Sequence, residues 1–204
     1  MTLLSEIQNT VKVNQPFMIE DILSPNFSYD TIRSMLSLYV KRGDIRRYCQ
    51  GIYYLPKRTI FGETKPTLEE VVNRKFISNK KDVYGYYSGM SLLNGVGLSM
   101  QVPIVPEITS TKETTRKKTY IINGRRVITR SSNIKINNNN YLYLQFLDIF
   151  RYATDEEIQK RRNNIIAFFK EKELKVEKLK KVELLVNEKI RNKFRRSIGY
   201  DELT

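Results

Sequence analysis

The 204-residue sequence predicts an α+β protein, because helical spacing of apolar residues alternates with short β-prone runs around turn signals. Two observations carry this prediction. Helix-like segments lead into a hairpin near the N-terminus, and Asn123-Gly124 separates two further β-prone runs. We expect a winged helix-turn-helix in residues 1–60, a linker in 61–66, a mixed α/β domain in 67–153, and a charged helical tail in 154–204.

The first region has the order helix, helix, turn, helix and hairpin. Apolar residues predict a helix over residues 2–13, and residues 17–23 read as a short second helix. A third helix follows, which the Ser28 hydroxyl can cap and Gly43 ends. Directly afterwards, the runs 44–48 and 52–55 flank Cys49-Gln50-Gly51, and we expect them to form the wing.

The second region mixes strands with helices. Its predicted helices cover residues 68–77, 88–93 and 141–152, and its predicted strands cover residues 83–87, 103–111, 119–122 and 126–129. The tail is expected to hold two helices. The second has an apolar stripe, which we interpret as a surface-packed helix, with core packing or a dimer seam as alternatives: Leu179, Val182, Val186, Ile190 and Phe194.

The composition favours an acidic partner over a catalytic role. Lys and Arg number 36 against 22 Asp and Glu, for a net charge of +14. The chain has no histidine and one cysteine, Cys49, which removes the commonest general base and most transition-metal sites. The carboxylates Glu69, Glu70, Asp82 and Glu107 are scattered. We therefore predict no catalytic residue, no metal and no cofactor.

The hydropathy of the chain predicts a cytoplasmic protein without a membrane partner. No run reaches the ~18 apolar residues that a membrane span needs. The N-terminus has neither the basic region nor the apolar stretch of a signal peptide.

The third helix and the wing predict a DNA-binding surface, because a recognition helix needs an exposed face that is polar, small or basic near its start. Arg33 and Ser34 are the candidates for base contacts, and Arg46 and Arg47 suit phosphates or the minor groove. Winged helices also bind proteins, and that alternative stays open. The predicted DNA-binding residues are Ser28, Tyr29, Arg33, Ser34, Lys41, Arg46, Arg47, Gln50 and Lys57.

A second basic patch surrounds the Asn123-Gly124 turn. It would extend the DNA footprint, meet an acidic protein surface, or remain a solvated hairpin. Its members are Arg116, Lys117, Lys118, Arg125 and Arg126, with Glu113 as the acidic residue among them.

Several segments resemble AbiEi-type antitoxins over residues 1–150. In the first region these are residues 31–36, 40–45 and 50–54 (TIRSML, VKRGDI and QGIYY). In the second they are residues 88–99 and 101–103 (SGMSLLNGVGLS and QVP). Leu38, Tyr39, Met90 and Asn94 depart from the residues common in that family, which weakens inferences about the operator sequence more than about the fold.

The resemblance implies a type IV toxin-antitoxin system. Such an antitoxin represses its own promoter by binding inverted repeats in double-stranded DNA, and it counters a nucleotidyltransferase-like toxin without a direct complex being required. A homodimer on the DNA would suit inverted repeats. One alternative is a stand-alone winged-helix regulator whose second domain dimerises or senses a ligand. Another is an accessory enzyme that uses carboxylates and Mg²⁺.

Overall fold

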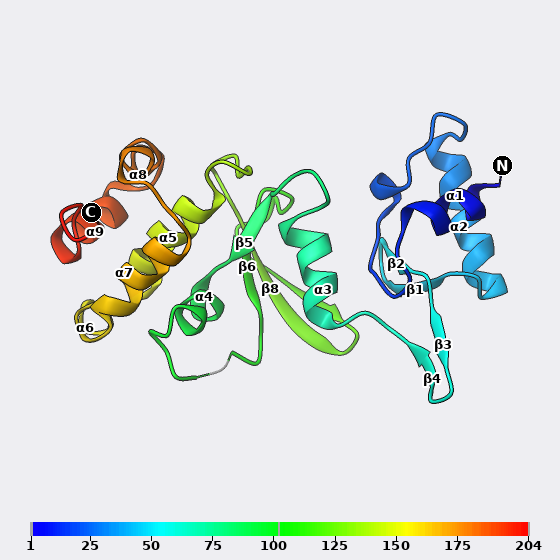
Figure 1. Ribbon diagram of the computed structural model, residues 1–204, viewed down its shortest axis with the longest axis horizontal. Helices are drawn as coiled ribbons and strands as arrows, with labels where there is room; N and C mark the ends of the chain where they lie inside the picture. Colours follow the sequence, from blue (N-terminus) through cyan, green and yellow to red (C-terminus); the bar gives the residue numbers. More distant parts are fainter. Residues whose placement is uncertain (1, 102, 204) are drawn as a thin grey trace. The chain divides into compact units, whose positions relative to one another are not determined.

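The computed structural model describes residues 2–101 and 103–203 (Figure 1). Helices and short sheets alternate along the chain, so the predicted α+β class is confirmed. The chain divides into two compact units. The N-terminal unit runs to Lys75 and includes Ile122–Gly124, and the C-terminal unit holds Phe76–Ile121 and the chain from Arg125 onward. The boundary therefore lies near residue 75, not within the predicted linker.

The N-terminal unit begins with two α-helices and one 3-10 turn. They are α1 (Leu3–Thr10), η1 (Ile19–Asp21) and α2 (Tyr29–Arg42). The second helix predicted over residues 17–23 is wrong, since only the short turn η1 forms there. Phe17 instead makes a β-bridge with Tyr53: the Phe17 amide donates to the Tyr53 carbonyl at 2.8 Å, and the Tyr53 amide donates back at 2.9 Å. This pairing holds the segment extended.

Two hairpins follow α2. The first pairs β1 (Arg46–Cys49) with β2 (Ile52–Tyr54), as predicted. The second pairs β3 (Lys57–Thr59) with β4 (Gly62–Thr64), so the predicted linker over residues 61–66 is wrong. The Thr59 side chain closes this turn, because its Oγ1 accepts from the Phe61 amide and donates to the Gly62 carbonyl.

The core of the N-terminal unit joins its helices to the first hairpin. The helix α2 contributes the i, i+4 pair Ile32 and Leu36, both fully buried, and α1 contributes Leu3 and Ile7. The helix predicted over residues 68–77 forms as α3 (Leu68–Val72), followed without a gap by a single π turn, η2 (Asn73–Ile77).

The C-terminal unit contains a four-stranded sheet with the order β5-β6-β8-β7. The strand β5 is antiparallel to β6, and β6 is parallel to β8. The strand predicted over residues 103–111 is confined to β6, and Val102 in the adjacent motif lies outside the described residues. The bounds are β5 Gly85–Tyr87, β6 Glu107–Ser110, β7 Lys118–Ile122 and β8 Arg125–Ser131.

The Asn123-Gly124 turn between β7 and β8 is confirmed. Both residues have positive φ, 49° and 76°, as the favoured two-residue hairpin turn requires.

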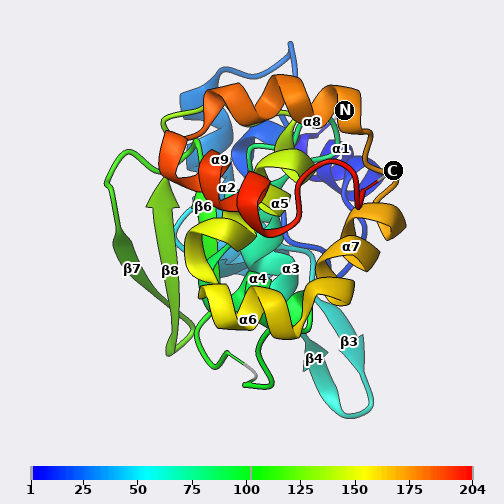
Figure 2. The same ribbon diagram turned by 90° about the vertical axis from the view of Figure 1, so that its left-hand side faces the viewer.

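The helices of the C-terminal unit centre on α5 (Tyr141–Tyr152), which packs against β5 and α4 (Gly89–Gly95). Ser88, which directly precedes α4, makes no side-chain capping bond, and its buried Oγ has no hydrogen-bond partner among the described residues. Four α-helices follow instead of the two predicted for the tail, and Figure 2 shows them around α5. They are α6 Asp155–Lys160, α7 Arg162–Glu171, α8 Val176–Val182 and α9 Glu188–Ser197, with the 3-10 turn η3 Glu183–Leu185 before α9.

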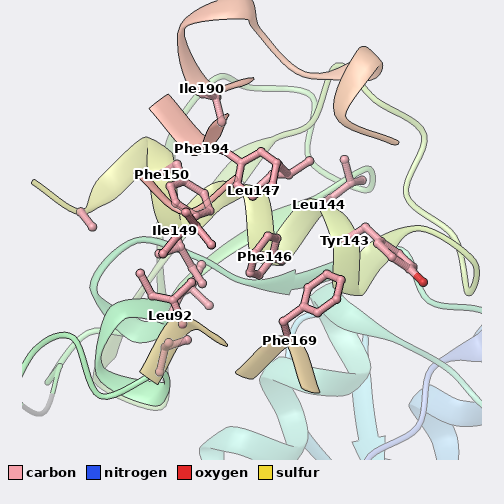
Figure 3. Packing of buried hydrophobic residues seen from close by; sticks show 14 of the residues in the cluster. Leu92, Tyr143, Leu144, Phe146, Leu147, Ile149, Phe150, Phe169, Ile190 and Phe194 are labelled. Atoms are coloured by element: carbon pink, nitrogen blue, oxygen red, sulfur yellow. The ribbon is translucent and has the colours of Figure 1, made fainter. Parts of the chain in front are cut away.

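The tail is part of the core of the C-terminal unit. Phe146 of α5 contacts Phe169 of α7 and Phe194 of α9, with ring centroids 5.1 and 5.8 Å apart (Figure 3). Leu179 and Phe194, from the predicted stripe, are fully buried. The surface-packed interpretation is therefore wrong. The stripe packs on α5, while the many charges of the tail occupy the other faces of the helices.

No helix in the described part of the chain is long and apolar enough to cross a membrane.

Candidate nucleic-acid interface

The helix α2 begins and ends where the sequence predicts. The Ser28 Oγ accepts a hydrogen bond from the Thr31 amide at 3.2 Å and lies 2.8 Å from the Thr31 hydroxyl. Gly43 ends the helix in the left-handed conformation, with φ at +85°. The Ser28 hydroxyl is therefore already committed to the helix start, although the residue is exposed.

The predicted DNA-facing side of α2 is exposed. Ile32, Leu36 and Tyr39 turn into the core and Met35 packs against it, so the other residues between them face solvent. Tyr29 at the first turn is 51% exposed. Leu38 is exposed to the same extent and interrupts the otherwise polar face. The exposed polar residues of this face are Arg33, Ser34, Ser37 and Lys41.

The two arginines of the predicted wing have different surroundings. The Arg46 Nε lies 2.9 Å from Glu63 Oε2, and its Nη2 lies 2.8 Å from Glu63 Oε1. This two-pronged ion pair lowers the pKa of Glu63 below its usual value, chiefly through the hydrogen bond from Arg46. Arg47 is exposed and has no ion pair within the described ranges. Of the two, Arg47 is the one available to a phosphate.

Two further predicted DNA-binding residues, Gln50 and Lys57, lie on either side of β2. Gln50 occupies the tight turn, where its backbone carbonyl accepts a hydrogen bond from Lys75 Nζ at 2.8 Å. Its side chain is exposed, and so is Lys57 on β3.

The second hairpin adds residues that the sequence did not single out. Arg58, on β3, has a side chain that is 81% exposed, and its Nε lies 3.8 Å from Glu63 Oε1. Ile60 and Phe61 form the tip and are each 94% exposed. The sequence feature that could have indicated this tip is the pair of large apolar residues between Thr59 and Gly62. The prediction of a linker in this segment left that feature unused.

The second basic patch lies in the C-terminal unit, on β7, β8 and the loop before them. Arg116, Lys117, Lys118, Arg125 and Arg126 are all exposed. Among the neighbouring cations, Arg130 is held by Glu107, with Arg130 Nη2 2.9 Å from Glu107 Oε2.

Glu113 organises the loop that carries this patch. Its carboxylate accepts from the Thr129 hydroxyl at 2.8 Å, the Tyr120 hydroxyl at 2.9 Å and the Thr115 amide at 3.2 Å. Burial acts to raise the pKa of Glu113, but these hydrogen bonds outweigh it, and the pKa lies below its usual value. The acidic residue of the patch is therefore buried and structural, and its exposed neighbours are basic.

A pocket of about 710 Å³ opens in the C-terminal unit between β8, α5 and the start of α9. Its lining includes the hydroxyl and amide side chains of Ser131, Ser132 and Asn133. Four of the lining residues are cationic, Arg116, Arg151, Lys189 and Lys193, and one is acidic, Asp148. The sequence did not predict this pocket, because it depends on how the tail packs.

Asp148 is the buried carboxylate of this pocket. It accepts a hydrogen bond from the Tyr86 hydroxyl at 3.1 Å, and its Oδ1 lies 2.9 Å from Arg151 Nε. Burial raises the pKa of Asp148 to about 6, against the opposing effect of Arg151. It also raises the pKa of Tyr86 well above its usual value. The Tyr86 ring therefore packs in the core beside its strand, and its buried hydroxyl has the hydrogen-bond partner that a core tyrosine needs.

The carboxylates considered for Mg²⁺ have separate structural partners. Glu70 forms a capping box with Thr67, in which its carboxylate accepts from the Thr67 amide at 2.7 Å. Glu107 holds Arg130. Over residues 2–101 and 103–203, no group of three or more His, Cys, Asp or Glu side chains is arranged to hold a metal ion.

Comparison with known proteins places the chain in a family without a described activity. No curated protein matches it. Residues 4–174 match the model of DUF6088, which is described as a family of unknown function. This range begins within α1 and extends three residues past the end of α7. The protein therefore belongs to the DUF6088 family.

Proposed function

We propose that this protein is a cytoplasmic, DNA-binding autorepressor that acts as the antitoxin of a type IV toxin-antitoxin system. In this proposal, α2 enters the major groove as the recognition helix of a winged helix-turn-helix. The segment that runs from η1 to the start of α2 serves as the turn of the helix-turn-helix. The β1–β2 hairpin serves as the wing. The target is the double-stranded DNA of its own promoter.

The exposed face of α2 is the observation that carries this proposal. Arg33, Ser34 and Ser37 project from a helix whose opposite face is fully buried, so the helix is held rigidly and presents its polar side. A guanidinium such as that of Arg33 can bind guanine O6 and N7 together. Arg47 and Lys57 add exposed cations on the hairpins, where phosphates would be contacted.

A titration of the full chain on its own upstream DNA tests this assignment. Arg33→Ala should weaken binding to the upstream sequence by about 10-fold or more and reduce its preference over a shuffled duplex. Arg47→Ala should weaken binding to both duplexes and lower the salt slope by about one unit.

Arg196→Ala is the matched control, because Arg196 is an exposed arginine on α9 in the C-terminal unit. All three variants remove one positive charge. Equal losses in the three would mean that only net charge matters, and DNA recognition by α2 would be rejected.

The antitoxin part of the proposal rests on the resemblance of residues 1–150 to AbiEi-type antitoxins. It predicts that co-expression restores growth to cells that produce a nucleotidyltransferase-like toxin encoded beside this chain. If growth is not restored although the protein still represses its promoter, the antitoxin role is rejected and the stand-alone regulator is supported.

A second candidate function, regulation by a small anionic ligand, is favoured by the pocket beside Asp148. Its cations exceed its acidic residues by four to one, and Asp148 is already bonded to Tyr86 and Arg151. A phosphate-bearing molecule fits this charge and size.

Thermal unfolding with pyrophosphate or ADP tests the pocket. Either ligand should raise the Tm of the wild type and not that of Lys189→Ala. Lys170→Ala, at an exposed position of α7, is the control. A shift of equal size in both variants would assign the effect to net charge and reject the pocket.

A further inference from the structure

The tip of the β3–β4 hairpin exposes two large apolar side chains. Ile60 and Phe61 are each 94% accessible to solvent, the highest exposure, shared with Ile104, among the large hydrophobic residues that the structure describes. Neither Ile60 nor Phe61 has positive φ, so the backbone of this turn would equally accept polar residues, which are usual at exposed turns. Apolar residues at this position lose hydrophobic stabilisation as long as they stay in water, which points to a contact made in a complex.

The hairpin holds this tip in a defined shape. Thr59 pairs with Gly62 across the turn, and the Thr59 hydroxyl donates to the Gly62 carbonyl at 2.8 Å and accepts from the Phe61 amide at 3.2 Å. Gly62 has φ at +108°, which an L side chain rarely adopts. In the middle of β4, opposite Arg58, Glu63 is joined to Arg46 of the preceding hairpin by two hydrogen bonds. The apolar tip is therefore presented on a braced arm.

Positive charge lies along the same arm. Lys57 and Arg58 on β3 are exposed, and Lys65 follows β4. Glu63 is the one acidic residue of residues 57–65, and it is already engaged by Arg46. A basic β-ribbon with an apolar end is complementary to the minor groove of DNA, where phosphates line the rim and stacked bases form the floor.

We propose that the β3–β4 hairpin enters the minor groove and inserts Phe61, supported by Ile60, between adjacent base pairs, thereby kinking the DNA. The inference rests on the proposed DNA binding and adds a second contact to it. The α2 face would read sequence in the major groove, while the hairpin would select for a flexible pyrimidine–purine step by the ease with which it unstacks.

A single-tryptophan variant measures the insertion directly, because the chain contains no tryptophan. Phe61→Trp keeps a large aromatic wedge, and stacking of the introduced indole on bases should quench its fluorescence when the upstream duplex is added. In parallel, Ile60→Ser/Phe61→Ser should lower affinity for that duplex by about 10-fold and abolish the bend seen in circular-permutation gel shifts.

Ile104→Ser is the matched control. Ile104 is also 94% exposed and lies in the C-terminal unit, so this variant changes an equally exposed apolar residue away from the hairpin. Circular dichroism and thermal unfolding should be unchanged in all the serine variants, because these side chains are exposed.

The outcomes separate this inference from the proposed function. Quenching in Phe61→Trp together with a lost bend in the double serine variant supports the wedge. If the double variant binds and bends DNA like the wild type, the wedge is overturned while DNA binding stands. If the introduced indole responds to anionic lipid vesicles, or to protein concentration without DNA, then a membrane or a second copy is the occupant and the wedge is again overturned. If the wild type binds no DNA, both proposals fall.

Discussion

Arg46 and Glu63 join the two hairpins of the N-terminal unit, with Arg46 Nε 2.9 Å from Glu63 Oε2 and Nη2 2.8 Å from Oε1. Because of this ion pair, the candidate DNA surface contains both arginines that are paired within the protein and arginines that are free to bind phosphate. Arg46 is neutralised within the protein and braces the second hairpin, whereas Arg47, the next residue, is exposed and unpaired over the described ranges. Adjacent arginines thus have different predicted roles.

Substitution of these three residues tests that division. We expect Arg47→Ala to lower the salt slope of DNA binding by about one unit, and Arg46→Ala to lower it by clearly less. Glu63→Gln should strengthen binding at low salt, because it removes the carboxylate that competes with phosphate for Arg46 and Arg58. Fluorescence anisotropy at several salt concentrations measures all three. Identical slopes for Arg46→Ala and Arg47→Ala would contradict the division.

Gly43 links the end of α2 to the same ion pair. Its φ is +85°, and a Cβ built there would lie 2.9 Å from Arg46 Nη1. Gly43→Ala should lower the free energy of unfolding by about 1 kcal/mol through the backbone conformation alone. It should also displace the Arg46 side chain, and hydrogen exchange in β4 should become faster.

Gly124→Ala is the control for this effect. Gly124 also has positive φ, at +76°, but a Cβ there would meet nothing within 4 Å. Faster exchange in β4 with both variants would show that the contact with Arg46 is not the cause.

Phe194 tests whether the tail belongs to the core of the C-terminal unit. It is fully buried against Phe146 and Phe150, with ring centroids 5.8 and 5.2 Å away. Phe194→Ala should therefore lower the free energy of unfolding by about 3–5 kcal/mol. Leu184→Ala, at a residue that is 63% exposed, should change it by less than about 0.5 kcal/mol. Urea denaturation measures the free energy of unfolding of both variants. A small change in Phe194→Ala would contradict the placement of the tail in the core.

Asp148 predicts a pH dependence of stability. Burial raises its pKa to about 6 from a usual value of 3.8, so the folded state holds the proton more tightly than the unfolded state. The stabilisation is complete below about pH 4 and is lost as the pH rises through about 6. Asp148→Asn should remove this dependence and raise the free energy of unfolding at pH 7 by about 1–3 kcal/mol.

Urea denaturation at pH 5 and pH 7 checks this expectation, with Asp82→Asn, at an exposed position, as the control. A wild-type pH slope in Asp148→Asn would assign the titration to another group.

Several elements could be predicted because their determinants lie within a few residues of one another. Ser28, Gly43 and the apolar spacing between them delimit α2, and the structure places this helix at Tyr29–Arg42. The Asn123-Gly124 dipeptide likewise predicts its hairpin, since both residues accept positive φ. In each case the local sequence restricts the backbone directly, and no distant partner is needed.

Other features depended on partners far along the chain. Phe17 forms a β-bridge with Tyr53, and this pairing keeps its backbone extended where the local pattern favoured a helix. The candidate site was predicted in part for the same reason. The exposure of Arg33 follows from helix periodicity, whereas the engagement of Arg46 by Glu63 arises between residues 17 positions apart.

The sequence by itself determined the α+β class, the helix α2 and its exposed face, and the excess of positive charge. The tertiary structure alone decided which charges are free, where the tail packs and which carboxylate is buried. Tyr86 and Asp148 meet across 62 positions. A contact of that range forms only when packing of the intervening segments offsets the entropy of closing the loop, so the full fold decides it and local pattern does not.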